Sequence, residues 1–258
     1  MTKIYAILSG KGGVGKTTTS INLASSLNKL GEDVIIVDGN LTTPNVGIHL
    51  GAPIVPITLN HVLNGQSAIE DAIYEHESGT KVIPASLSLK EIEKIDYRKI
   101  PDVLKKLKKL TNYVLIDSAA GLGEEARFAI VSADEIIIVT NAEMSAVTDA
   151  LKTIKLAEEY HKPVKGVIIT RYTGSNTDMS FVSITDMLEV PILGIIPEDR
   201  AVKESQVIKN AVVHTHPHSK ASKSYVNTTK RILGEEIPLM KTPLGIVGNF
   251  LRALGLRN

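Results

Sequence analysis

Three features are missing from this chain, and each absence excludes a class of protein. There is no cysteine, which excludes disulfide bonds, thiolate metal sites and cysteine-held iron–sulfur clusters. The net charge is only +1, so overall charge does not mark a nucleic-acid binder. No apolar run is long enough to span a bilayer, and no signal peptide precedes the first apolar segment. We therefore expect a soluble or peripheral protein.

The apolar residues fall into short runs separated by amphipathic segments. The chain has 258 residues, of which 43% are hydrophobic, enough for one sizeable α/β domain. The runs predict buried strands at Ile4–Leu8, Val34–Val37, Val114–Ile116, Ile136–Val139, Val164–Ile169 and Ile192–Ile196. The segments between them predict helices at Lys16–Leu30, Pro101–Leu110, Ser145–Tyr160, Asp178–Leu188 and Lys220–Leu233. This alternation predicts a doubly wound, mainly parallel sheet flanked by helices, with a ligand at the carboxyl ends of the strands.

A complete phosphate-binding loop follows the first predicted strand. Residues 10–17 read Gly-Lys-Gly-Gly-Val-Gly-Lys-Thr and lead into the first predicted helix, which is the context that the motif requires. Glycines let backbone N–H groups close around phosphate oxygens, and a helix N-terminus favours anions. Lys16 is expected to reach the β- and γ-phosphates, and the Thr17 hydroxyl to bind Mg²⁺. The loop predicts a P-loop NTPase fold.

Lys11 is an additional cation inside this loop. Its ammonium could serve its own site, or reach across an interface to the phosphates of a second subunit. With its residues 11–17, Lys-Gly-Gly-Val-Gly-Lys-Thr, the chain resembles the MinD/ParA family of deviant Walker A ATPases. The resemblance implies that ATP and Mg²⁺ are the cofactors, and that Lys11 acts in trans in a dimer that sandwiches two nucleotides.

The resemblance covers nearly the whole chain and implies a set of site residues. It assigns catalytic roles to Lys11, Lys16, Asp38 and Asn40. It assigns the binding of Mg²⁺ to Thr17, Asp38 and Asp117. Contacts to the nucleotide fall on Gly10, Lys11, Gly12, Gly13, Val14, Gly15, Lys16, Thr17, Thr18, Asn45, Thr170, Arg171, Pro197 and Asp199. The chain has no Asn-Lys-x-Asp guanine motif, so adenine is the expected base.

Asp38 ends the second predicted strand, and Asn40 follows two residues later. An acid beside a phosphate loop can hold Mg²⁺ or orient a water, although Asp-Gly-Asn is also a common turn sequence. In the resembling family both positions are aspartates, and the second is thought to help activate the attacking water. Asparagine can hold a water but cannot accept its proton. We therefore expect ATP binding with slow hydrolysis.

Asp117 ends another apolar run, in the Walker B arrangement in which an acid helps to fix Mg²⁺. The alternative is a strand-end aspartate that caps the next helix. The residues 118–123 resemble the second switch of the family, with Ala119 in place of a proline. That replacement loosens the switch backbone but removes no ligand. Gly121 permits a mobile backbone near the γ-phosphate.

Three later segments extend the resemblance. Thr170 replaces an asparagine that contacts adenine in the family, so this contact is expected to be weak or absent, whereas Pro197-Glu198-Asp199 is intact. Asp149 stands where the family has an aspartate that pairs with the signature lysine when nucleotide is absent. An ordinary helix-surface acid is the alternative interpretation of Asp149.

His214, His216 and His218 alternate around Pro217. In an extended segment they would share a face and could bind a metal ion. A polar loop before the last helix is the favoured interpretation, because no carboxylate or cysteine lies close by in the sequence.

The end of the chain predicts a separate unit. We expect an ATPase domain at 1–237, a linker at 238–243 and an amphipathic helix at 244–258. One side of that helix carries Leu244, Ile246, Val247, Phe250, Leu251 and Leu254, and arginines add basic character, which suits a membrane interface. The alternative is a helix docked on the core of the domain. The tail resembles the membrane-targeting helix of the family, and two copies on a dimer would bind by avidity.

The sequence thus predicts an ATP-dependent, dimerising, membrane-associated ATPase of the MinD type. It would lie in the cytoplasm, peripheral at the inner face of the cell membrane, and regulate the placement of cell-division or polar machinery with an activating protein partner. One alternative is a ParA-like partition ATPase that binds DNA non-specifically, which the balanced charge and apolar tail make the second choice. Another is a nucleotide-gated scaffold with little turnover, which Asn40 suggests. An assembly ATPase that carries metal clusters is disfavoured by the absence of cysteine.

Overall fold

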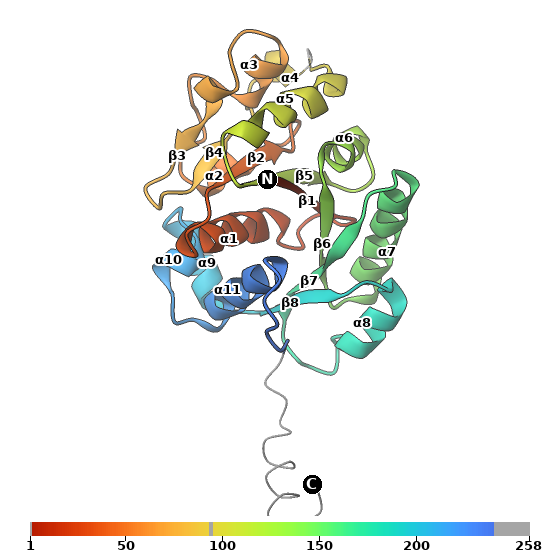
Figure 1. The fold of residues 1–258 in the computed structure, drawn as a ribbon. Coiled ribbons are helices and arrows are strands. Elements are labelled where there is room, and N and C mark those ends of the chain that lie inside the picture. Colours follow the sequence, from red (N-terminus) through yellow and green to blue (C-terminus); the bar gives the residue numbers. More distant parts are fainter. Residues whose placement is uncertain (1, 93–94, 240–258) are drawn as a thin grey trace, which may run out of the picture.

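A single sheet organises the part of the chain that the structure describes, residues 2–92 and 95–239 of a computed structural model. Its strands run in the order β3-β4-β2-β5-β1-β6-β7-β8 (Figure 1). Every neighbouring pair is parallel except β3 and β4. The predicted doubly wound, mainly parallel α/β sheet is confirmed.

The elements have the following bounds. The strands are β1 (Lys3–Ser9), β2 (Val34–Gly39), β3 (Tyr74–Glu75), β4 (Lys81–Ile83), β5 (Tyr113–Ala120), β6 (Glu135–Asn141), β7 (Val164–Tyr172) and β8 (Ile192–Pro197). The α-helices are α1 (Lys16–Lys29), α2 (Val46–His49), α3 (Leu59–Leu63), α4 (Leu89–Ile92), α5 (Ile100–Lys106), α6 (Glu124–Ser132), α7 (Met144–Glu159), α8 (Phe181–Leu188), α9 (Arg200–Val207), α10 (Val212–Thr215) and α11 (Lys220–Ile232). The 3₁₀-helices are η1 (Glu70–Ala72), η2 (Tyr97–Lys99) and η3 (Leu107–Lys109).

The central strands are apolar on consecutive positions because both faces of the sheet are covered. Along β1, Ile4, Ala6 and Leu8 belong to one buried cluster, and Tyr5 and Ile7 to the other. The first cluster contains residues of α5, α6, α7 and α8, and the second contains residues of α1, α10 and α11. Figure 1 shows these two groups of helices on opposite sides of the sheet. The two clusters are the hydrophobic core that fixes the strand ends.

The strand order places the phosphate-binding loop in the middle of the sheet. The loop follows β1, which lies between β5 and β6. The chain crosses from β1 through α1 to β2 on one side, and from β5 through α6 to β6 on the other. Such a reversal leaves a crevice outside the carboxyl ends of the strands, where α/β proteins bind ligands.

The six predicted strands and five predicted helices are present, with ends shifted by a few residues. The prediction missed β3 and β4 and the helices α2, α3, α4, α6, α9 and α10. Most of these elements have two to five residues, too few to show a hydrophobic period.

The described chain ends at the edge strand β8. The guanidinium of Arg231 donates hydrogen bonds of 2.7 Å to the carbonyl oxygens of Ile237 and Pro238, and one of 2.9 Å to that of Leu193 in β8. The predicted amphipathic helix at 244–258, and the linker beyond residue 239, lie outside the described residues. Among the described helices, none has the length and apolar character that a bilayer crossing requires.

Candidate nucleotide and magnesium site

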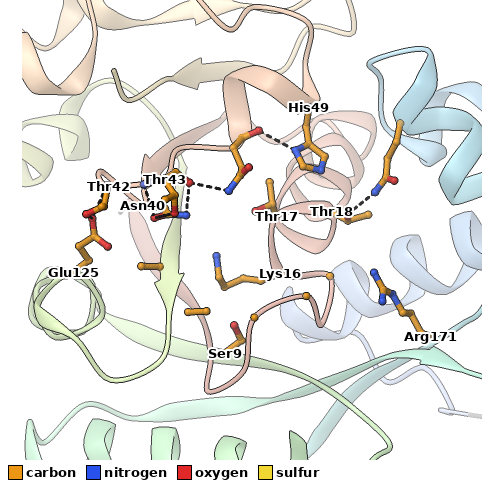
Figure 2. A pocket seen from close by; sticks show the side chains of 17 residues that line it. Ser9, Lys16, Thr17, Thr18, Asn40, Thr42, Thr43, His49, Glu125 and Arg171 are labelled. Atoms are coloured by element: carbon orange, nitrogen blue, oxygen red, sulfur yellow. Dashed lines mark hydrogen bonds between the residues drawn. The ribbon is translucent and has the colours of Figure 1, made fainter. Parts of the chain in front are cut away.

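A cavity of about 720 Å³ opens at the carboxyl ends of β1, β2 and β5. Figure 2 shows its three walls. The phosphate-binding loop and the start of α1 form the first, the segment after β2 forms the second, and the end of β5 with α6 forms the third. The main residues of these walls are Gly12, Gly13, Gly15, Lys16, Thr17 and Thr18, then Asn40, Thr42, Thr43, Asn45 and His49, then Ala119, Ala120 and Glu125.

The backbone of the loop is built to hold an anion. Gly13 and Gly15 have φ angles of +79° and +87°, values that side-chain-bearing residues rarely adopt. Gly15 is the N-cap of α1, which has no side-chain cap and no acidic residue in its first turn. The N–H groups and positive dipole end of α1 therefore remain available to phosphate oxygens.

Not every loop residue lines the cavity. A Cβ atom built on Gly10 would lie 2.2 Å from the carbonyl oxygen of Asp149 in α7, so a glycine is required here by close packing. Val14 is buried, and its carbonyl oxygen accepts a 2.5 Å hydrogen bond from the Thr170 hydroxyl. Neither residue is among those that line the cavity, so their roles in nucleotide binding stay predictions.

Lys16 and Thr17 converge on Asp117. The Lys16 ammonium donates to Asp117 Oδ1 at 3.0 Å and to the carbonyl oxygen of Ser118. The Thr17 hydroxyl donates to Asp117 Oδ2 at 2.6 Å, and the Ser20 hydroxyl to Oδ1 at 2.9 Å. A hydroxyl beside a fully buried carboxylate is an oxygen donor set of the kind that Mg²⁺ accepts. The residues present therefore fit a magnesium ion.

Asp38 is a second fully buried carboxylate, opposite Asp117 in the pairing of β2 with β5. Its Oδ2 accepts 2.9 Å hydrogen bonds from the backbone N–H groups of Asn45 and Val46. Burial, and then the charge of Asp117, raise its pKa to about 7, although hydrogen bonds from the backbone N–H groups of Val46 and Asn40 and the charge of Lys16 act in the opposite direction. Because the charged carboxylates lie close together, a cation at this point is favourable.

Replacing Asp38 by asparagine is expected to stabilise the ligand-free protein at pH 8 more than at pH 5. The raised pKa means that folded Asp38 keeps its proton between about pH 4 and pH 7, where the unfolded chain has lost it. Stability from this group is therefore present at low pH and is lost as the pH rises through the folded pKa. Thermal unfolding of both proteins at the two pH values measures the effect. An equal melting-temperature difference at pH 5 and pH 8 would contradict it.

Asn40 lines the cavity, but its polar atoms are engaged locally. Its Nδ2 donates to the carbonyl oxygen of Thr43 at 2.6 Å, and its Oδ1 accepts from the Thr43 hydroxyl at 3.0 Å. The side chain thus closes the turn that follows β2. The expectation that Asn40 holds a water stays a prediction, and in this conformation the side chain would first have to leave Thr43.

Lys11 points away from the cavity that Lys16 occupies. Its ammonium lies 3.1 Å from Glu143 Oε2 and 3.5 Å from the Ser145 hydroxyl, at the start of α7. Asp149, the family-implied partner, instead pairs with Lys152 at 3.0 Å. The Lys11–Asp149 pair that the resemblance implies is therefore absent, and the alternative interpretation of Asp149, an acid on the helix surface, agrees with the structure. The backbone of Asp149 nonetheless packs against Gly10 of the loop.

The predicted base-contacting residues line a smaller cavity of about 80 Å³, which shares Gly15, Thr18, Arg171 and Gln206 with the first. Thr170, Arg171, Pro197 and Asp199 all border it. The polar atoms of two of these side chains already form hydrogen bonds within the protein. The Thr170 hydroxyl is buried against the loop, and the Asp199 carboxylate accepts 3.0 Å hydrogen bonds from Ala201 N and Ala221 N at the starts of α9 and α11. A base contact at Asp199 would therefore involve its backbone.

Several residues that line the cavities were not predicted from the sequence, among them Glu125, His49 and Gln206. Glu125 and His49 border the large cavity, and Gln206 borders both. The Gln206 amide donates to the Thr18 hydroxyl at 2.9 Å. None belongs to a recognisable motif, although Glu125 lies in an acidic first turn, a typical helix-start signal.

The three histidines do not gather into a metal site. His214 belongs to α10, which breaks the extended alternation, and His216 Nε2 lies 3.4 Å from Glu204. Within residues 2–92 and 95–239, no group of three or more potential ligands is placed to hold a metal ion. The polar-loop interpretation is closer to the structure, with a short helix in place of part of the loop.

Two family models match the chain. A model described as an AAA domain matches residues 2–165. A model of 4Fe-4S iron sulfur cluster binding proteins of the NifH/frxC family matches residues 107–253. Since the chain has no cysteine, it lacks the thiolates that hold such clusters, and the second match reflects the shared ATPase architecture.

Relatives with the same architecture cover the chain almost completely. An uncharacterized ATP-binding protein of Methanocaldococcus jannaschii is 37% identical, over 96% of this chain and 95% of its own length. The cell division ATPase MinD of Pyrococcus furiosus superimposes with a TM-score of 0.87 at 37% identity, over 91% of this chain and 99% of that one. MinD of Pyrococcus horikoshii, solved in complex with Mg-ADP, gives 0.86 at 36% identity, over 92% and 100%. With its complete phosphate-binding loop and the buried Asp117 beside it, this chain belongs to the MinD/ParA family of P-loop ATPases.

Proposed function

We propose that the chain binds Mg·ATP in the large cavity, dimerises around it and hydrolyses it to ADP and phosphate. The observation that carries the proposal is the opposite placement of the two loop lysines. Lys16 is buried inside the cavity, whereas the Lys11 side chain is 44% exposed outside it. A cation on the rim can reach the phosphates of a facing subunit, which is the trans role that the family resemblance implies.

Different residues would bind the phosphates, the metal ion and the base. The loop N–H groups and Lys16 would hold the phosphates, while Thr17, Asp38 and Asp117 would hold the metal ion, directly or through water. Mg²⁺ supplies charge that neutralises the phosphate oxygens as the terminal bond breaks. The base would lie toward Arg171, Pro197 and Gln206. Binding of an adenine nucleotide together with Mg²⁺ is supported by the Pyrococcus horikoshii relative, which was solved in complex with Mg-ADP.

The proposal extends to membrane association and to the spatial regulation of cell division or other polar machinery. Two observations support it: the amphipathic pattern of residues 244–258, and the similarity to the cell division ATPase MinD of Pyrococcus furiosus. A single weak helix on a monomer binds a membrane poorly, whereas two on a dimer gain roughly 10²–10⁴ in affinity through avidity. ATP binding would thereby be coupled to membrane residence, and a protein partner that speeds hydrolysis would release it.

Co-sedimentation with anionic liposomes tests this extension. The full chain and a chain that ends at Lys241 are compared with Mg·ATP, with Mg·ADP and without nucleotide. The expected result is pelleting with ATP that is lost on truncation. No pelleting in any state removes the membrane role and favours the partition-ATPase alternative, which predicts steeply salt-dependent DNA binding.

Asn40→Asp is expected to raise turnover. An aspartate in place of Asn40 can accept a proton from water, and a positioned general base contributes roughly 10²–10⁴-fold. The gain should be smaller here because the side chain must first leave Thr43. Phosphate release at saturating Mg·ATP is the measurement. A rate equal to that of the wild type would contradict the prediction. A wild-type rate near zero would favour the alternative of a nucleotide-gated scaffold with little turnover.

A further inference from the structure

The large cavity contains very few groups that can take a proton. Among its lining residues in the described part of the chain, Glu125 is the one carboxylate and His49 the one imidazole. Asp38 and Asp117 are fully buried beneath the surface. Their oxygens already accept hydrogen bonds from the backbone of α2, or from Lys16 and Thr17. Neither buried aspartate is therefore placed to receive a proton from a water in the cavity.

Glu125 lies where the second and third walls of the cavity meet. It is in the first turn of α6, directly after the glycines of residues 121–123. Its Oε1 accepts hydrogen bonds from both the backbone N–H and the hydroxyl of Thr42, at 2.7 and 2.8 Å. Both contacts fall on one oxygen, so they orient the carboxylate while leaving Oε2 for a further hydrogen bond.

Thr42 stands two residues after Asn40, so Glu125 brings a carboxylate from the third wall into contact with the wall that carries the asparagine. Figure 2 shows Glu125, Thr42 and Asn40 together on one side of Lys16, with His49 on another. His49 bonds through Nδ1 to the carbonyl oxygen of Asn45, from within α2. The carboxylate, and not the imidazole, therefore contacts the turn that Asn40 closes.

We propose that Glu125 is a catalytic residue of this ATPase, acting as the base that Asn40 cannot be. In this step the water oxygen bonds to the γ-phosphorus, and the bond from that phosphorus to the bridging oxygen breaks, with its electron pair leaving on ADP. The water proton passes to Oε2 of Glu125 and from there to solvent. The inference rests on the proposed ATP hydrolysis. Glu125 would supply the proton acceptor that is missing at position 40.

Glu125→Gln tests this role with little change in shape. Glutamine keeps an oxygen that can accept from Thr42 but cannot take up a proton. The expected result is a fall in single-turnover phosphate release of roughly 10²–10⁴-fold, with the affinity for Mg·ATP retained. Glu124→Gln is the matched control, because Glu124 lies in the same first turn but does not line the cavity. Its rate should equal that of the wild type.

A double variant tests whether Glu125 acts as a base or only as a structural contact. Asn40→Asp in the Glu125→Gln background places a carboxylate on the neighbouring wall and should recover part of the lost rate. A base role predicts that Glu125→Gln lowers the rate much less in the Asn40→Asp background than in the wild type, whereas a residue that only tied α6 to Thr42 would lower the rate by the same factor in both. Glu125→Asp, which keeps the charge and shortens the side chain, is a second route if the glutamine variant fails to fold, and should retain partial activity.

The outcomes distinguish this inference from the proposed function. Wild-type phosphate release that survives Glu125→Gln unchanged overturns the role of Glu125 alone. Loss of release in His49→Gln but not in Glu125→Gln assigns the proton to the imidazole and also overturns it. No phosphate release from the wild type or from Asn40→Asp, despite bound Mg·ATP, contradicts hydrolysis itself.

Discussion

Lys16→Ala is expected to lower the affinity for Mg·ATP by roughly 10²–10⁴-fold, because it removes two charge-assisted hydrogen bonds, to the β- and γ-phosphates, of about 1.5–3 kcal/mol each. The ammonium is the cation of the phosphate-binding loop and lies inside the cavity. Equilibrium titration with a fluorescent ATP analogue and Mg²⁺ measures the loss. Affinity within a few-fold of the wild type would contradict the placement of the phosphates against Lys16.

The same variant should also destabilise the ligand-free protein. Lys16 pairs with the buried Asp117 at 3.0 Å and lowers the electrostatic cost of Asp38 nearby. Removing one partner of a buried ion pair lowers the free energy of unfolding by about 3–5 kcal/mol. This range is an upper limit here, because Asp38 can take up a proton and so reduce the unpaired negative charge. Lys81→Ala is the matched control, since Lys81 pairs with Asp33 at 2.8 Å on the surface. An exposed pair contributes at most about 1 kcal/mol, so the control should melt close to the wild type.

Lys11→Ala is expected to separate nucleotide binding from turnover. Lys11 lies outside the cavity of its own chain, so Mg·ADP should bind as before. If its ammonium completes the site of a facing subunit, ATP-dependent dimerisation is lost and turnover falls. Cations supplied in trans to phosphoryl transfer contribute on the order of 10³–10⁵-fold. Phosphate release and Mg·ADP titration on the same preparation measure the two effects.

Lys108→Ala provides the comparison for Lys11. Its side chain is 38% exposed against 44% for Lys11, and it pairs with Asp134 at 2.7 Å. Asp134 also accepts a hydrogen bond from the N–H of Ile4 near the start of β1, at the end of the strand away from the phosphate-binding loop. Equal effects of the two substitutions would show that Lys11 acts only through general surface charge.

The elements that sequence reasoning predicted well are those specified locally. Runs such as Ile4–Leu8 are apolar on every position because helices cover both faces of the sheet, and this pattern is strong even in one sequence. The phosphate-binding loop and Asp117 are likewise fixed by short motifs. By contrast, β4 has three residues and pairs with β2 through contacts that no local pattern reveals.

The hydrogen-bond and ion-pair partners of the site residues could not be predicted, because they depend on packing between segments that are distant in the sequence. Lys11 pairs with Glu143 because α7 packs on Gly10 through the backbone of Asp149. Asp199 matches a nucleotide-binding segment, yet its carboxylate is used by α9 and α11. Glu125 reaches the cavity only because α6 begins beside Thr42, more than eighty residues away in sequence. None of these outcomes is encoded within a single motif.

Mg·ATP is expected to make a dimer of this chain. Light scattering on a size-exclusion column equilibrated with the nucleotide measures the mass of the particle. In Mg·ATP the expected mass is twice the 27.8 kDa of one chain, and in Mg·ADP it is the mass of a single chain. A single-chain mass in both nucleotides, from protein shown to bind ATP, rules out the proposed dimer.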